Sequence, residues 1–257
     1  MAEVSSSVEG RVVVITGAGQ GIGRTYAKHF AANGAVPVIA ELEGENGEAV
    51  AAEIRADGGD ALAIRTDVTD PDSVRAMVDA VLERHGRIDC LINNAAIFVK
   101  LGRQPFWEID LAEWRAVMDV NITGCFICAA AVAGPMRAAG GGRIINISSS
   151  TVPLGIPGFT HYVTSKSALI GMTRCMAREL GDANITVNAV LPGMIETEVE
   201  NAGRTDQSRA AVIGHQSLKR QQEPEDMAGT LLYLASPASG FMTGSRFAST
   251  AARRSSR

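Results

Sequence analysis

The stretch that decides the fold is RVVVITGAGQGIG, residues 11–23. Its first half is a near-continuous run of β-branched residues, which is typical of a strand buried on both faces of a parallel sheet. A glycine-rich turn follows, and residues 24–35 then have the pattern of a helix that ends at Gly34. A strand that leads through glycines into a helix is the opening unit of a dinucleotide-binding fold.

The alternation of strands and helices continues along the chain. The patterns predict further strands at 36–43, 61–70, 88–96, 142–150 and 185–193, and helices at 44–59, 71–86, 112–139, 160–181 and 224–236. Such alternation predicts the α/β class, as one Rossmann-type domain with a doubly wound parallel sheet. We expect a flexible tail at 1–9 and the domain at 10–243. The polar stretch 194–223 follows a strand's carboxyl end and is the predicted substrate lid.

The composition is that of an ordinary enzyme. The chain has 257 residues, 46% of them hydrophobic, and a formal charge of −4, so we expect neither a nucleic-acid nor a membrane partner. The N-terminus lacks a signal-like pattern, and we find no apolar run approaching the roughly 18 residues of a membrane span, which predicts a cytoplasmic protein. Cys125 and Cys128 form a single C-x-x-C pair, which we interpret as helix core and not as a metal site.

The glycine turn is one half of a predicted nucleotide site. Glycines at 17, 19, 21 and 23 would let the backbone approach a pyrophosphate, next to the positive end of the helix dipole. Glu41, 18 residues after Gly23, lies where an acid would bind the adenosine ribose and repel a 2′-phosphate. Because Gln20 supplies no cation for that phosphate, NAD is favoured over NADP. Glu43 is the alternative acid if the strand ends later.

Polar and small residues follow the next two strands. Asp67 and Val68 end the third strand, and Asn94 and Ala95 end the fourth. Carboxyl ends of neighbouring parallel strands line one crevice, where Asp67 could accept from an adenine amino group and Ala95 leaves space for a ribose. Each of these residues, taken singly, could instead belong to a turn, because Asn and Asp are favoured in turns.

The segment HYVTSK, 161–166, suggests the reacting group. Tyr162 and Lys166 are four residues apart, so they share one helix face. An ammonium near the phenol would lower the pKa of Tyr162 from about 10 toward the working pH, so that it could exchange a proton with a substrate oxygen. His161 has no assigned role, and we expect it on the surface beside the helix start.

These motifs together resemble the classical short-chain dehydrogenase/reductase family over about 10–243. The carriers are TG-x-x-x-G-I-G at 16–23, N-N-A at 93–95, Asn121 in DVNITG, Y-x-x-x-K at 162–166 and PGMIET at 192–197. The resemblance implies that Tyr162 is the general acid/base and that Lys166 binds the nicotinamide ribose. Asn121 would hold a water, and Ser149, thirteen residues before the tyrosine, would bind the substrate oxygen. Ser148 and Ser150 are the alternatives to Ser149.

The resemblance also implies which residues hold the cofactor. With the groups named above, the cofactor-binding set is Gly17, Gln20, Gly21, Ile22, Gly23, Glu41, Asp67, Val68, Asn94, Ala95, Tyr162, Lys166, Pro192, Gly193, Ile195 and Thr197.

The expected activity is hydride transfer between NAD(H) and a secondary alcohol or ketone. Apolar side chains that would wall the pocket suggest an apolar substrate; they are Phe98, Phe106, Trp107, Val152, Leu154, Ile156 and Phe159. The stretch 150–166 is similar to that of aromatic secondary alcohol dehydrogenases. The alternatives are a 3-oxoacyl-[acyl-carrier-protein] reductase and a noncatalytic dinucleotide-binding protein. We expect a homo-oligomer, tetramer or dimer.

The tail at 244–257 departs from the family. Members typically continue past F-x-T-G-Q into a last strand that ends in a V-D-G-G-like turn, whereas this basic tail shows no strand alternation. The codons GGC AGT CGA TTC GCG TCG ACG GCG GC would encode Gly244–Ala252, and read from their third base they give QSIRVDGG. A frameshift is our hypothesis for this ending. On that hypothesis the seventh strand and its subunit contacts are lost, and the edge of the sixth strand is underpaired.

Overall fold

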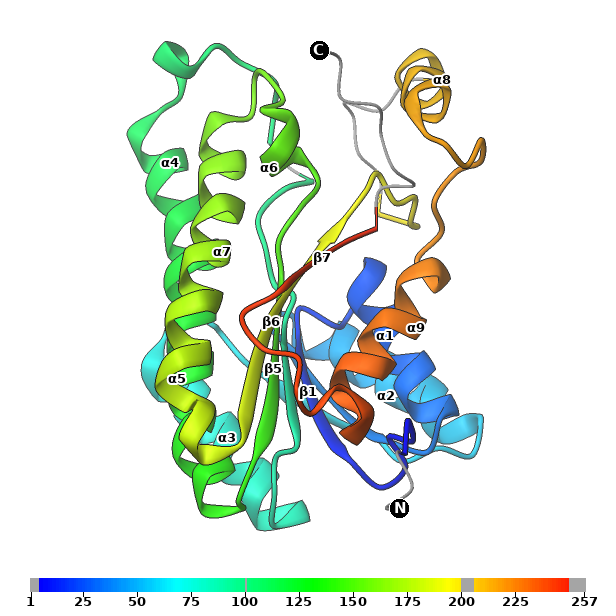
Figure 1. The fold of residues 1–257 in the computed structure, drawn as a ribbon, viewed down its shortest axis with the longest axis vertical. Coiled ribbons are helices and arrows are strands. Elements are labelled where there is room, and N and C mark those ends of the chain that lie inside the picture. The colour runs from blue at the N-terminus through cyan, green and yellow to red at the C-terminus, as the bar shows by residue number, and fades with distance from the viewer. Residues whose placement is uncertain (1–4, 100, 200–205, 250–257) are drawn as a thin grey trace.

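A seven-stranded parallel sheet forms the centre of the molecule (Figure 1). The computed structural model describes residues 5–99, 101–199 and 206–249, and within them the strand order is β3-β2-β1-β4-β5-β6-β7. The strands are β1 (Val12–Thr16), β2 (Val36–Glu41), β3 (Leu62–Arg65), β4 (Cys90–Asn93), β5 (Gly142–Ile147), β6 (Ile185–Pro192) and β7 (Arg246–Ser249). The order reverses at β1, which lies between β2 and β4. The predicted doubly wound Rossmann-type domain is confirmed.

Helices cover both faces of this sheet (Figure 1). One face carries α1 (Gly21–Ala32), α2 (Gly44–Ala56) and α9 (Glu225–Ala235). The other carries α3 (Pro71–His85), α5 (Cys125–Ala138) and α7 (Thr160–Leu180), with α4 (Leu111–Met118) packed on α7. Shorter elements are a 3₁₀ turn at Phe106–Glu108, α6 (Thr151–Leu154), 3₁₀ turns at Gly181–Ala183 and Pro237–Ser239, and α8 (Asp206–His215).

The side chains of β1 explain why this strand is central. Val13 and Ile15 pack with Tyr26 of α1, whereas Val12 and Val14 pack on the opposite face among residues of α3 and α5. Successive strand residues point to opposite faces, so a run of β-branched residues fills both layers of the core. Burying each of these side chains contributes roughly 1.5–3 kcal/mol.

The helix predicted at 112–139 is interrupted by a π-helical turn at Asp119–Gly124, between α4 and α5. The prediction that no apolar run could span a membrane is wrong, since the helical span Leu111–Ala138 is long and apolar enough to do so. In the fold, however, Cys128, Val132 and Met136 of this span are buried in the core. The span is therefore a core helix of the domain. Cys125 and Cys128 are both buried in it, which confirms the prediction that they are core residues.

Both ends of the described chain are more ordered than the sequence suggests. Val8, in the predicted flexible tail, is only 2% exposed and packs in the core. The expected loss of a seventh strand is not observed, because β7 pairs in parallel with β6 from Arg246 to Ser249. Backbone groups at the open edge of β6 can pair with any extended segment, and Phe247 adds a partly buried side chain. Residues 250–257 of the tail lie outside the described residues.

Candidate active site

The glycine turn between β1 and α1 is packed so tightly that side chains do not fit. A Cβ on Gly17 would lie 2.9 Å from Cα of Ala95, and one on Gly23 would lie 2.4 Å from the carbonyl oxygen of Gly17. Gly17 and Gly21 also have positive φ angles of 63° and 59°. The turn therefore presents bare backbone at the N-terminus of α1, the arrangement that receives a pyrophosphate. Ile22, behind it, packs against the core.

A carboxylate from the predicted lid lies at this helix N-terminus. The N–H of Gly21 donates to Oε1 of Glu198 at 3.0 Å, and Arg24 lies 3.8 Å from the same oxygen. Gln20, at the N-cap of α1, makes no capping bond through its side chain, and the first turn contains no acidic residue. Glu198 thus serves as the missing cap. Sequence analysis did not find it, because its 177-residue separation from Gly21 leaves no local signal.

Glu41 lies at the end of β2, as predicted, and reaches the same turn. Its carboxylate accepts from the N–H of Gly19 at 2.8 Å and from the N–H of Glu43 at 3.3 Å. The side chain is 9% exposed. These bonds hold the acid against the glycine turn.

The ends of β3 and β4 carry the next predicted residues. Asp67 accepts from both the N–H and the hydroxyl of Thr69, which is the turn chemistry that the sequence left open. Val68 packs against Gly124 in the π turn, where a Cβ would lie 2.7 Å from Cγ2. Asn94 donates to the carbonyl oxygens of Thr16 and Gly17, at 2.9 and 3.0 Å. Asn94 thus fixes the strand end beside the glycine turn.

Asn121 is fully buried in the π turn and connects three segments. Its side-chain oxygen accepts from the N–H of Ile97 at 2.8 Å, and its amide donates to the hydroxyl of Ser165 at 3.0 Å. π turns occur frequently at functional sites because they redirect one residue out of the helical repeat. This residue is held between the segment after β4 and α7.

Tyr162 lies in the first turn of α7, and the hydroxyl of Ser149 is near enough to act on the pKa of its phenol. Ser149 also accepts from the N–H and the hydroxyl of Thr151, at 3.1 and 3.0 Å. Ser148 differs, because its hydroxyl donates to the backbone oxygen of Lys166 at 2.7 Å. Of these two serines, Ser149 is therefore the one whose hydroxyl meets the tyrosine.

Lys166 is placed behind the ring of Tyr162. Its ammonium lies 5.8 Å from the ring centroid and donates to the carbonyl oxygen of Ile147 at 2.8 Å. Burial lowers the pKa of Lys166 to about 8. The expected lowering of the tyrosine pKa is not found: burial raises the pKa of Tyr162 to about 12, and the Ser149 hydroxyl opposes this only partly. Lys166 is not among the causes of the change, so desolvation dominates.

His161 is not at the surface. It is 0% exposed, and its Nε2 lies 3.1 Å from Oε1 of Glu113 in α4. The surface prediction is wrong because α4 packs over this side of α7, a tertiary contact with no trace in the local sequence.

Some of the predicted wall residues gather around Tyr162. The rings of Phe98 and Tyr162 have centroids 4.4 Å apart, and Phe159 lies 5.7 Å from Phe98. Ile156 packs against the same cluster, Val152 is half-buried and Leu154 is 38% exposed. Phe106 and Trp107 contact each other instead and remain 66% and 71% exposed.

The predicted lid begins and ends at neighbouring positions. Beyond Pro192, the N–H of Gly193 donates to Gln222 at 3.1 Å, and Ile195 pairs with Gln222 in a parallel bridge. The hydroxyl of Thr197 lies 3.9 Å from where a Cβ of Gly21 would be, so this segment crosses the N-terminus of α1. The lid contains α8, and its residues 200–205 lie outside the described residues.

Comparison with known proteins shows the family to which this chain belongs. A family model described as Enoyl-(Acyl carrier protein) reductase matches residues 17–249. A 3-oxoacyl-[acyl-carrier-protein] reductase of Synechocystis sp. is 37% identical over 245 residues, 94% of this chain and 96% of that protein. The chain belongs to the short-chain dehydrogenase/reductase family. This confirms the resemblance seen in the sequence.

Two solved structures of the family show what such sites hold. A 7α-hydroxysteroid dehydrogenase, complexed with NADH and 7-oxo glycochenodeoxycholic acid, superposes with a TM-score of 0.91 at 31% identity, over 98% of this chain and 97% of that one. A structure from Beutenbergia cavernae with bound NADP, described as a "putative NAD(P) dependent gluconate 5-dehydrogenase", gives a TM-score of 0.87 at 34% identity, over 95% of this chain and 96% of that one. This short-chain dehydrogenase/reductase is an oxidoreductase that acts on an alcohol or ketone, in a family that uses NAD(H) or NADP(H).

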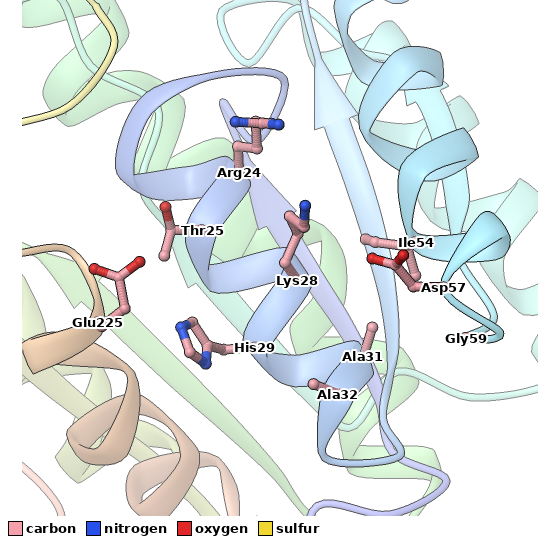
Figure 2. Close-up of a pocket in the computed structure, with 10 residues that line it drawn as sticks. All are labelled: Arg24, Thr25, Lys28, His29, Ala31, Ala32, Ile54, Asp57, Gly59 and Glu225. Atoms are coloured by element: carbon pink, nitrogen blue, oxygen red, sulfur yellow. The ribbon is translucent and has the colours of Figure 1, made fainter.

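A separate hollow of about 440 Å³ lies on the outer side of α1, between α2 and α9 (Figure 2). It contains none of the predicted site residues. Its cations Arg24 and Lys28 pair with Glu53, at 2.7 and 3.1 Å. The hollow is therefore a surface feature of this short-chain dehydrogenase/reductase and not its reaction site.

Proposed function

We propose that this protein interconverts a secondary alcohol and a ketone with NAD(H), using Tyr162 as general acid/base. The observation that carries the proposal is that the Ser149 hydroxyl lies close enough to the phenol of Tyr162 to act against the rise of its pKa. Two hydroxyls that meet at the same point can bind one substrate oxygen together. They do so at the carboxyl edge of the sheet, where open α/β sheets bind ligands.

In the reducing direction, Ser149 would donate a hydrogen bond to the substrate carbonyl and Tyr162 would give its proton to that oxygen. The nicotinamide, when bound, supplies the hydride to the carbonyl carbon. Burial favours the protonated form of Tyr162, which suits a proton donor. Lys166, behind the ring, would bind the nicotinamide ribose, and Asn121 would position the segment after β4.

Glu41 supports NAD as the cofactor. Its carboxylate bonds to Gly19 in the glycine turn, where it would accept from the adenosine ribose and repel a 2′-phosphate. Replacing Glu41 with Ala is expected to reduce the preference for NADH over NADPH, measured as the ratio of kcat/KM, by about tenfold or more, since one hydrogen bond to a charged group contributes about 1.5–3 kcal/mol. Glu43→Ala is the matched control. An equal effect of the two substitutions would show that Glu41 is not the acid that selects NADH.

An apolar substrate fits the wall of the site. Phe98, Phe159 and Ile156 belong to the apolar cluster that contains Tyr162, and the Phe98 ring contacts the Tyr162 ring. We therefore expect aryl or cyclic ketones to be better substrates than short hydrophilic ones. A panel of secondary alcohols and ketones, assayed with each cofactor, tests this expectation.

Replacing Tyr162 with Phe is the decisive test. Loss of the hydroxyl is expected to lower kcat at least about 100-fold, the lower part of the range for general acid catalysis, while NADH still binds. Turnover is followed by NADH absorbance and binding by fluorescence titration. Activity at the level of the unmodified protein would refute the mechanism.

A second candidate is reduction of 3-oxoacyl thioesters, which is supported by the similarity to the 3-oxoacyl-[acyl-carrier-protein] reductase of Synechocystis sp.. A 3-oxoacyl thioester included in the same panel separates the two. A kcat/KM for the thioester above that of every simple ketone would select this second function.

A further inference from the structure

The buried ring of His161 is the strongest feature that the reaction leaves unused. It precedes Tyr162 in the first turn of α7 and is 0% exposed. An ionised Glu113 can only accept, so the bond at 3.1 Å requires the hydrogen on Nε2 of His161. The other ring nitrogen, Nδ1, is buried and has no hydrogen-bond partner among the described residues.

Glu113 extends this contact to a third segment. The oxygen that faces His161 also accepts from the side-chain amide of Gln104 at 2.6 Å. The backbone N–H of Gln104 donates to the carbonyl oxygen of Gly158 at 3.2 Å, just before α7. We call Gln104, Glu113 and His161 the His161 cluster. It joins residues 101–105, the start of α4 and the start of α7.

Residues 101–105 continue the wall that covers Tyr162. The N–H of Leu101 donates to the carbonyl oxygen of Phe98 at 3.0 Å, and Leu101 packs in the cluster that contains Tyr162. The guanidinium of Arg103 lies 5.3 Å from the ring centroid of Phe159. The position of the Phe98 ring on Tyr162 is therefore coupled to whatever holds residues 101–105.

A phenylalanine in place of His161 would fill similar space without a polar atom. Burying a ring nitrogen without a partner costs free energy that an apolar ring avoids. The hydrogen bond to Glu113, in contrast, fixes a direction between two helices, which apolar packing does not. The histidine is therefore better explained by positioning than by stability.

We propose that His161 is a positioning residue for the substrate. Through Glu113 and Gln104 it holds residues 101–105 against the first turn of α7, so that Phe98 and Tyr162 keep one geometry around the substrate carbonyl. The inference rests on the proposed function, since it names a further residue that orients the same substrate.

The test compares His161→Phe with His161→Gln, whose amide can still donate to Glu113. In H161F the KM for the best ketone should rise about tenfold, while the Kd for NADH stays within about twofold; H161Q should recover most of the loss. Glu113→Leu combined with H161F should cost no more than Glu113→Leu alone, because Glu113→Leu already removes the bond that H161F removes, together with the contact to Gln104. The exposed Glu108→Gln is the matched control and should leave KM unchanged.

Amide hydrogen exchange gives a second measurement that needs no turnover. The N–H groups of Leu101 and Gln104 should exchange about tenfold faster in H161F than in the unmodified protein. Unchanged exchange, or additive effects of H161F and Glu113→Leu, would overturn the proposal, as would a parallel loss of NADH binding. A failure here while Tyr162→Phe abolishes turnover leaves the proposed function standing, whereas an active Tyr162→Phe refutes that function itself.

Discussion

Lys166 shows how burial sets the chemistry of a single residue. Its ammonium donates to the carbonyl oxygen of Ile147, and burial lowers its pKa from 10.5 to about 8. The motif Y-x-x-x-K predicts which residues meet, but not the direction of the pKa change of Tyr162. Desolvation depends on every element packed around the pair, and that packing is not encoded in the motif.

The lowered pKa of Lys166 predicts how stability changes with pH. Between about pH 8 and pH 10.5 the unfolded lysine holds its proton and the folded one has lost it, so this group makes stability rise with pH. The free energy of unfolding of the unmodified protein minus that of Lys166→Met should increase by about 2 kcal/mol from pH 7 to pH 9.5, at about 1.4 kcal/mol per pKa unit. Urea titrations measure both. The buried cysteines contribute in the opposite direction in both proteins, so taking the difference removes their contribution. A difference that does not change with pH would contradict the lowered pKa of Lys166.

At the scale of elements, we expect Glu198 and the cofactor to compete for the N-terminus of α1. The N–H of Gly21 donates to Glu198, which lies in the segment beyond β6. A pyrophosphate at this helix N-terminus would need the same donor and would meet the negative charge of Glu198. We therefore expect cofactor binding to displace the carboxylate of Glu198.

Replacing Glu198 with Gln removes that competing charge. NADH should bind about two- to fivefold more tightly to E198Q, since a charge at a helix terminus contributes about 0.3–1 kcal/mol. Fluorescence titration measures the Kd, and Glu45→Gln, an exposed change of equal charge in α2, is the control. Weaker binding in E198Q would show that Glu198 supports the bound cofactor instead.

At the scale of the whole molecule, β7 closes the sheet with an unusual sequence. Its pairing with β6 is supported by the N–H of Gly244, which donates to Val187 at 2.7 Å, and by Asn188, which bonds to both Met242 and Ser245. Of its side chains, Phe247 packs against the core. The strand is therefore held in the sheet by backbone hydrogen bonds and by the packing of Phe247.

A chain in which QSIRVDGG follows Gly244 tests the frameshift hypothesis. The replacement would put an isoleucine at position 247 and a valine at 249, and we expect a gain of about 1–2 kcal/mol, or a rise in Tm of about 2–8 °C. Phe247→Ala in the chain as it stands should move Tm the other way. An unchanged or lower Tm with the replacement would favour the present ending, and sequencing the encoding DNA checks the frame directly. Size-exclusion chromatography of both chains tests the predicted homo-oligomer.

The sequence by itself determined the sheet, its direction and the residues at its carboxyl edge. These depend on local signals: β-branched runs, a glycine turn, and strand ends such as Asn94 that recur after each strand. Only the tertiary structure decided that His161 is buried against Glu113 and that Glu198 caps α1. It also decided that 246–249 form a strand. Each of these rests on a contact between segments far apart in the chain, where the partner's burial and backbone, and not local pattern, fix the outcome.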